Sequence, residues 1–191
     1  MNRPKFNFLF AAFFAVCFFS LNNAFAQTPS PKRPAEPSFD VVLQTVVASN
    51  DSAGKSVAQP LAAIIKKLRN DFAFSDYRLT STLMQRVSNN GNFELKSLGY
   101  EENQDKNFPV FLEWSLSGLQ ILADESGQET IQIQNFRFGQ RVPIKGLNNL
   151  TTYEAVGLTN KFSLPKNTPT VVGTLAASKP GELIFLILTV R

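Results

Sequence analysis

Alternation of apolar and polar residues dominates the chain from residue 39 onward. Successive side chains of a strand point to opposite faces, so alternation over several residues predicts a half-buried β-strand. The segments with this pattern, or with a short apolar run, are residues 39–47, 77–87, 93–97, 110–122, 130–138, 153–158, 161–164, 170–175 and 183–190. Residues 139–150 carry a looser pattern and are predicted to be irregular.

One stretch follows a helical period instead. Ser56 and Gln59 have the spacing of a capping box, which marks a helix start. The apolar residues that follow recur every three or four positions and predict one buried stripe on an amphipathic helix. That stripe consists of Val57, Leu61, Ile64, Ile65 and Leu68.

Two turns connect predicted strands. Residues 88–91 read Ser-Asn-Asn-Gly, and Asn and Gly accept the positive φ of tight hairpin turns. We therefore expect residues 77–87 and 93–97 to form a hairpin. Residues 178–181, Ser-Lys-Pro-Gly, predict a second turn between the last two strands.

The final strand, residues 183–190, is apolar on both faces. Such a strand belongs in the middle of a sheet whose two faces are both covered. The helix is the natural cover for one face. The sum is an α+β domain, with one N-terminal amphipathic helix packed on a mainly antiparallel, strand-rich domain; a β-sandwich-like arrangement is the alternative.

The first 26 residues have the form of a bacterial-type signal peptide. Arg3 and Lys5 precede a long apolar run, and Ala24-Phe25-Ala26 presents small residues where a signal peptidase cuts. We predict cleavage after Ala26, export to the periplasm or the cell exterior, and no membrane span afterwards. Residues 27–38 contain four prolines and predict a disordered linker. Residues 39–191 are then a single domain.

Loss of the signal peptide changes the composition of the mature chain. It removes the only cysteine, Cys17, and eight of the 18 phenylalanines. It also removes two of the 19 basic residues and none of the 15 acidic ones, leaving a net charge of about +2. This charge is too small to favour nucleic acid. With no thiol and no histidine, we predict no disulfide, no metal site and no cofactor.

Candidate chemistry is sparse. Gly54-Lys55-Ser56 precedes the helix as a phosphate-binding loop would. The first glycine of that motif is missing, however, and an exported protein meets little nucleotide, so we expect no nucleotide site. Glu101, Glu102 and Asp105, and Asp124, Glu125 and Glu129, form two acidic clusters in predicted turns. Glu113 lies within a strand and is expected to face solvent or to pair with a basic residue on a neighbouring strand.

Aromatic residues provide the one candidate ligand site. Phenylalanines two residues apart place both rings on one face of a strand, and core packing is the favoured role. The alternative is a cavity for a small ligand or lipid. Its lining residues would be Phe72, Phe74, Trp114, Phe136 and Phe138.

Two stretches resemble the secretins and associated envelope proteins of bacterial secretion and pilus systems. The strand–helix–strand order of residues 39–87 is similar to their small periplasmic modules. Pro-Thr-Val-Val-Gly-Thr-Leu at 169–175 and Gly-Glu-Leu-Ile-Phe-Leu-Ile-Leu at 181–188 resemble the end of the secretin core. The resemblance covers about a quarter of the chain, implies an accessory or module-like protein and transfers no functional residue.

The favoured function is a non-enzymatic exported protein that binds or scaffolds another envelope protein, because a strand-rich domain offers edges to which a partner strand can add. A periplasmic domain that binds a small ligand or lipid is the alternative. A carboxylate-dependent hydrolase is the remaining enzymatic candidate, and the absence of histidine counts against it.

Overall fold

The computed structural model describes residues 36–50, 59–99, 109–123, 127, 129–146, 150–177 and 179–191. All of them lie in one compact unit, Glu36–Arg191. The elements are β1 (Ser38–Ser49), a short 3₁₀ helix η2 (Gln59–Leu61), α2 (Ala62–Asp71), β2 (Asp76–Ser88), β3 (Asn92–Leu98), β4 (Phe111–Ala123), β5 (Glu129–Lys145), β6 (Thr151–Pro165), β7 (Thr170–Ala176) and β8 (Leu183–Val190).

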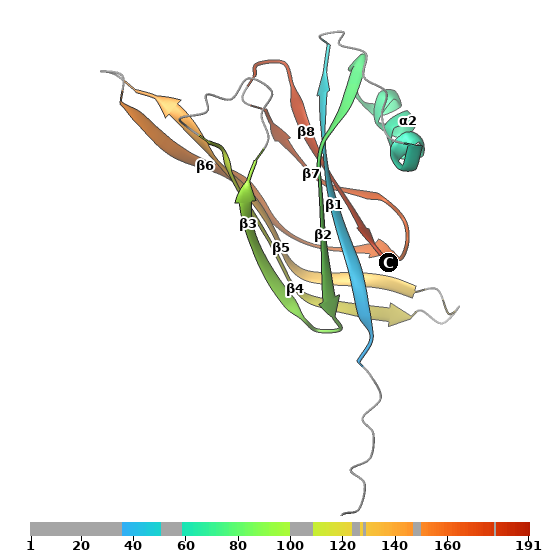
Figure 1. Ribbon diagram of the computed structural model, residues 1–191. Coiled ribbons are helices and arrows are strands. Elements are labelled where there is room, and N and C mark those ends of the chain that lie inside the picture. The colour runs from blue at the N-terminus through green and yellow to red at the C-terminus, as the bar shows by residue number, and fades with distance from the viewer. Residues whose placement is uncertain are drawn as a thin grey trace, which may run out of the picture. The chain divides into compact units, whose positions relative to one another are not determined.

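The strands form two four-stranded sheets (Figure 1). The first has the order β2-β1-β8-β7 and the second the order β3-β4-β5-β6, and every pairing is antiparallel. One core cluster contains buried residues of both sheets, so the sheets pack face to face. The predicted α+β, strand-rich fold is confirmed, in its sandwich-like form.

The first sheet is covered on both faces. Its central strand β8 alternates between two cores: Ile184 and Leu186 face the second sheet, whereas Phe185 and Ile187 face the helix. Seven of its eight residues are buried. The central position predicted for this apolar strand is therefore confirmed, as is the turn that pairs it with β7.

Helix α2 provides the second cover. Leu61, Ile65 and Leu68 are buried against the sheet, as the helical stripe predicts. The helix begins later than expected, at Ala62 after the η2 turn. The predicted cap at Ser56 lies outside the described residues.

The predicted hairpin at residues 88–91 is wrong. The turn itself exists, with Asn90 at φ 59°, but β2 belongs to the first sheet and β3 to the second. β2 pairs with β1 along its length, from Asp76 to Ser88. The turn is anchored to other partners, because the Asn90 N–H donates to the Leu119 carbonyl oxygen over 2.8 Å. At this turn the chain therefore crosses from the first sheet to the second, whereas the local sequence predicts that β3 pairs with β2.

The second sheet is a meander of long strands. β5 continues to Lys145 and β6 runs unbroken from Thr151 to Pro165, so the prediction of irregular structure over residues 139–150 is wrong for most of that segment. β4 contains one irregularity, at Gly118, whose φ is +66°. A Cβ atom at this position would lie only 2.7 Å from the Gln134 side chain.

Several predictions lie outside the described residues. They are the signal peptide, most of the linker, the Gly54-Lys55-Ser56 motif, the acidic residues Glu101, Glu102 and Asp105, and Asp124 and Glu125. Within the described ranges, no helix is both long enough and apolar enough to cross a membrane.

Candidate functional site

The five aromatic residues predicted to line a cavity fall into two groups. Trp114, Phe136 and Phe138 are fully buried between the two sheets. Phe72 and Phe74 pack in the other cluster, between α2 and the first sheet. The first sheet separates the groups, so the structure does not bring the five residues together around one space.

The three buried rings fill the core. Trp114 packs edge-on against Phe93 with ring centroids 4.6 Å apart, and Phe136 contacts Phe162 at 5.6 Å. The Trp114 indole Nε1 has no hydrogen-bond partner among the described residues. For Phe136 and Phe138, the core packing favoured from their i, i+2 spacing on one face of a strand is observed.

Phe72 and Phe74 do not lie on a strand, contrary to that interpretation of their spacing. They follow the end of α2 in irregular backbone. Phe72 contacts the Phe185 ring at 5.0 Å, and Phe74 contacts Tyr77 at 6.4 Å. They close the space between the helix and the sheet.

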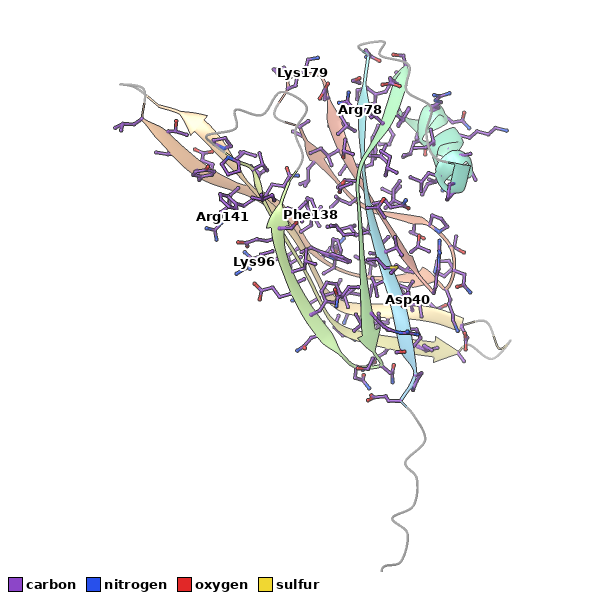
Figure 2. The ribbon with its side chains drawn as sticks, in the orientation of Figure 1. Asp40, Arg78, Lys96, Phe138, Arg141 and Lys179 are labelled. Carbon is purple, nitrogen blue, oxygen red and sulfur yellow. The ribbon has the colours of Figure 1, made fainter. Side chains whose placement is uncertain are left out.

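The middle of the outer face of the second sheet, turned away from the first sheet, carries charged side chains. Glu113 Oε1 accepts a hydrogen bond from Arg141 Nη2 over 2.9 Å, across β4 and β5. The predicted pairing of Glu113 with a basic residue is thus confirmed. Figure 2 labels Arg141 and Lys96 on this side of the sheet.

A second ion pair lies on the neighbouring strand β3. Lys96 Nζ contacts Glu94 Oε1 at 2.9 Å, and both side chains are about two-thirds exposed. The hydrogen bond from Lys96 lowers the pKa of Glu94, and the same contact raises the pKa of Lys96, with Glu113 adding to the effect. Lys96 is also directly opposite Glu113 in the register of β3 and β4.

A hollow of about 290 Å³ opens on this outer face, over β4, β5 and β6. Gly139 of β5 and Gly157 of β6 are register partners, so two neighbouring side chains are missing from the surface. The outward-facing residues that line the hollow are Glu113, Arg137, Gly139, Arg141, Ala155, Gly157 and Thr159.

Exposed apolar side chains gather at one end of the same sheet. β3 and β4 contribute Leu98 and Phe111, which are register partners. The Phe111 ring also contacts Tyr153 of β6, with centroids 5.6 Å apart. We call this set the apolar end patch; its members are Leu98, Phe111, Ile144, Leu150, Tyr153 and Val156, with exposed fractions of 39–67%.

Other predicted chemistry has little support among the described residues. Glu129, the one described member of its acidic cluster, is paired with Lys166 Nζ over 2.6 Å. No group of three or more metal-ligating side chains lies within the described ranges.

Sequence reasoning missed Arg137, Gly139 and Arg141. The signal was present, because these residues alternate with Phe136, Phe138 and Gln140 and so continue the strand period.

Comparison with known proteins gives no family. No family model and no curated protein matches the sequence. A search of solved structures finds the secretin InvG of the Salmonella SPI-1 type III secretion injectisome, residues 176 to its end, in the open gate state. The TM-score is 0.35 with 10% sequence identity, covering 98% of this chain and 65% of that one. The likeness is weak and carries no conclusion about function.

Proposed function

We propose that this protein is a non-enzymatic, exported module of the bacterial cell envelope that binds another protein along strand β6. The observation that carries the proposal is the apolar end patch beside an open sheet edge. Its members lie on both faces of the sheet, with Leu98, Phe111 and Tyr153 on the outer face and Ile144 and Val156 on the inner face, and exposed apolar clusters mark interaction sites. Six of the eight large exposed apolar residues found in the described chain belong to this patch.

Strand β6 has the form of a docking edge. It is the outermost strand of its sheet and is 15 residues long, and 11 of these residues are exposed. Natural edges are usually protected by lysine, proline or bulges. Between Thr151 and Asn160 the only charged residue is Glu154, and the strand has no proline before Pro165. In Figure 1 this end of β5 and β6 extends away from β1 and β8.

The patch fits an added strand better than a flat partner. Tyr153 points to the outer face of the sheet and Val156 to the inner face, because their positions alternate along β6. A partner strand paired with β6 also alternates and contacts both faces at once. The main-chain hydrogen bonds of such a complex supply affinity, and the side chains supply specificity.

The test uses a photo-activatable side chain at Val156 in the cell, with the same group at Lys67 on the exposed side of α2 as the control. We expect one envelope protein to cross-link at position 156 and not at position 67. The resemblance of residues 169–188 to secretins makes components of secretion and pilus systems the first partners to examine.

Purified components complete the test. The double variant Ile144→Asp/Val156→Asp should weaken binding of the identified partner about tenfold or more, because interface centres tolerate charge poorly. Met84→Asp is the matched control, since Met84 is 67% exposed on β2 of the other sheet. Equal cross-linking at both positions, or unchanged binding by the folded double variant, would overturn the proposal.

A further inference from the structure

The hollow lies beside the proposed docking edge. Its floor is the backbone of Gly139 and Gly157, which are opposite each other on β5 and β6. A strand that adds to β6 would lie about 4.8 Å beyond it. A side chain on that strand opposite Gly157 would therefore enter a space that neither β5 nor β6 fills. At other register positions, side chains of these strands occupy the corresponding space.

The charge at the hollow is unbalanced. Its charged lining residues are Glu113, Arg137 and Arg141. Arg141 is held by Glu113 at 2.9 Å, whereas the Arg137 side chain makes no ion pair or hydrogen bond with a described residue. The other nearby carboxylate, Glu94 on β3, is already bound to Lys96. The charge of Arg137 also helps to lower the pKa of Glu94, but its guanidinium makes no direct contact with that carboxylate and can bind an external anion.

The two arginines flank Gly139 on the same face of β5. They lie two residues before and after Gly139, so all three positions share the outer face. The separation along the strand is about 6.6 Å from Gly139 in each direction. Because Arg141 already binds Glu113, the register partner of Gly139, a carboxylate entering beside Gly139 would pair with Arg137, and arginine binds carboxylate with two parallel hydrogen bonds.

We infer that the hollow recognises the carboxylate of a Glu or Asp side chain on the strand that docks along β6. The inference rests on the proposed function and names the chemistry of the partner: an extended acidic segment. Its acidic side chain faces Arg137 across the two glycines, and its alternate side chains face the opposite side, where Val156 is exposed.

This contact contributes specificity more than affinity. Ion pairs on a protein surface are weak, because solvent screens them and long side chains lose freedom. We therefore expect a glutamate-containing strand to bind about three- to tenfold more tightly than its glutamine counterpart at low salt. The preference should shrink as ionic strength rises.

The probes are two synthetic strands, acetyl-Thr-Val-Thr-Val-Glu-Val-Thr-Val-Thr-amide and the same peptide with Gln in place of Glu. Each is titrated into the isotope-labelled mature protein, and NMR follows the backbone amides of β6 and the guanidinium Nε–Hε of Arg137. We expect both peptides to shift the β6 amides and only the Glu peptide to shift the Arg137 signal strongly.

Two variants test the site itself. Arg137→Gln removes the available cation, and Gly139→Val adds a side chain over the hollow, where a Cβ meets no atom closer than the Val156 carbonyl oxygen at 3.8 Å. Both should abolish the preference for Glu. Lys161→Gln removes an equal charge from β6 outside the hollow and should keep the preference.

The outcomes separate the two proposals. If both peptides bind β6 equally, docking at the edge stands and carboxylate recognition is wrong. If neither peptide shifts the β6 amides, strand docking and the carboxylate inference both fail. A Glu preference that survives Arg137→Gln places the anion elsewhere and overturns the site.

Discussion

The two sheets of this domain have the same number of strands and opposite environments. The β2-β1-β8-β7 sheet is covered by the other sheet on one face and by α2 on the other. The β3-β4-β5-β6 sheet has the same core on one face and charged side chains, a hollow and exposed apolar residues on the other. The first sheet therefore contributes mainly to the stability of the domain, whereas the second sheet has a face that partners can reach.

The sharpest test of this division compares two phenylalanines. Phe185 is completely buried on the helix side of the first sheet, whereas Phe111 is 41% exposed on the outer face of the second. Phe185→Ala should cost about 3–5 kcal/mol of unfolding free energy, and Phe111→Ala less than about 1 kcal/mol. Urea denaturation of the two variants measures the difference. If Phe185→Ala does not fold, Phe185→Leu should fold with a smaller loss; equal costs at the two sites would contradict the division.

Within the second sheet, two glycines should respond in opposite ways. Gly118 has φ +66°, and a Cβ there would lie 2.7 Å from the Gln134 side chain. We expect Gly118→Ala to cost about 2–3 kcal/mol. Gly139 has open space above it, so Gly139→Ala should be neutral or stabilising by about 0.5 kcal/mol. Thermal melting of both variants checks the pair. A destabilised Gly139→Ala would mean that the hollow is not open.

The link between the sheets should show an intermediate effect. Asn90 combines φ 59° with a side-chain oxygen that accepts from Gln120 Nε2 over 2.8 Å. Asn90→Ala loses both features and should cost about 1–2 kcal/mol, whereas Asn90→Gly keeps the backbone freedom and should cost about 1 kcal/mol less. Equal losses in urea denaturation would show that the hydrogen bond, and not the backbone conformation, holds the link.

The smallest effect is expected from titration. Burial raises the pKa of Tyr77 in the covered region, and the nearby Arg69 opposes this shift. A raised pKa stabilises the fold below the unfolded pKa of tyrosine, and this contribution is lost as pH rises through the folded value. Stability should therefore fall at alkaline pH less steeply in Tyr77→Phe than in the native chain.

On the outer face of the second sheet, the corresponding pH effect is expected in the acidic range. Lys96 lowers the pKa of Glu94, so any stability from this pair is present above the unfolded pKa of glutamate and is lost as pH falls through the folded value. In Lys96→Gln the pKa of Glu94 should move up. NMR titration of the Glu94 carboxyl measures it, and an unchanged value would show that the pair does not form in solution.

Sequence patterns predicted the elements better than their pairing. The continuous apolar run of β8 requires a covered central strand, and the stripe of Leu61, Ile65 and Leu68 requires a helix facing a core. The turn at Asn90 is different, because its residues accept a positive φ whether or not the flanking strands pair. Which strand joins β2 is decided by β1, a strand far from it in the sequence, and no local signal contains that information.

The end of β5 was missed for a related reason. Gly139 and Pro143 both weaken a strand pattern. β4 pairs with β5 only as far as Arg141, so Pro143 lies in an edge segment of β5, where proline is tolerated. The hollow could not be predicted either, since it exists only because Gly139 and Gly157 become register partners through the β5–β6 pairing.

The pairing of β1 with β8 joins the two ends of the domain. Val41 is the register partner of Val190 and Ala48 of Leu183, so the first strand of the domain is completed by the last one. Contacts so distant in sequence slow folding, because a long loop must close before they form. Before residues 183–190 pair with β1, this apolar strand lacks one of its two neighbours and can pair with other chains. A chain cut short by a few C-terminal residues should therefore aggregate rather than fold into a smaller domain.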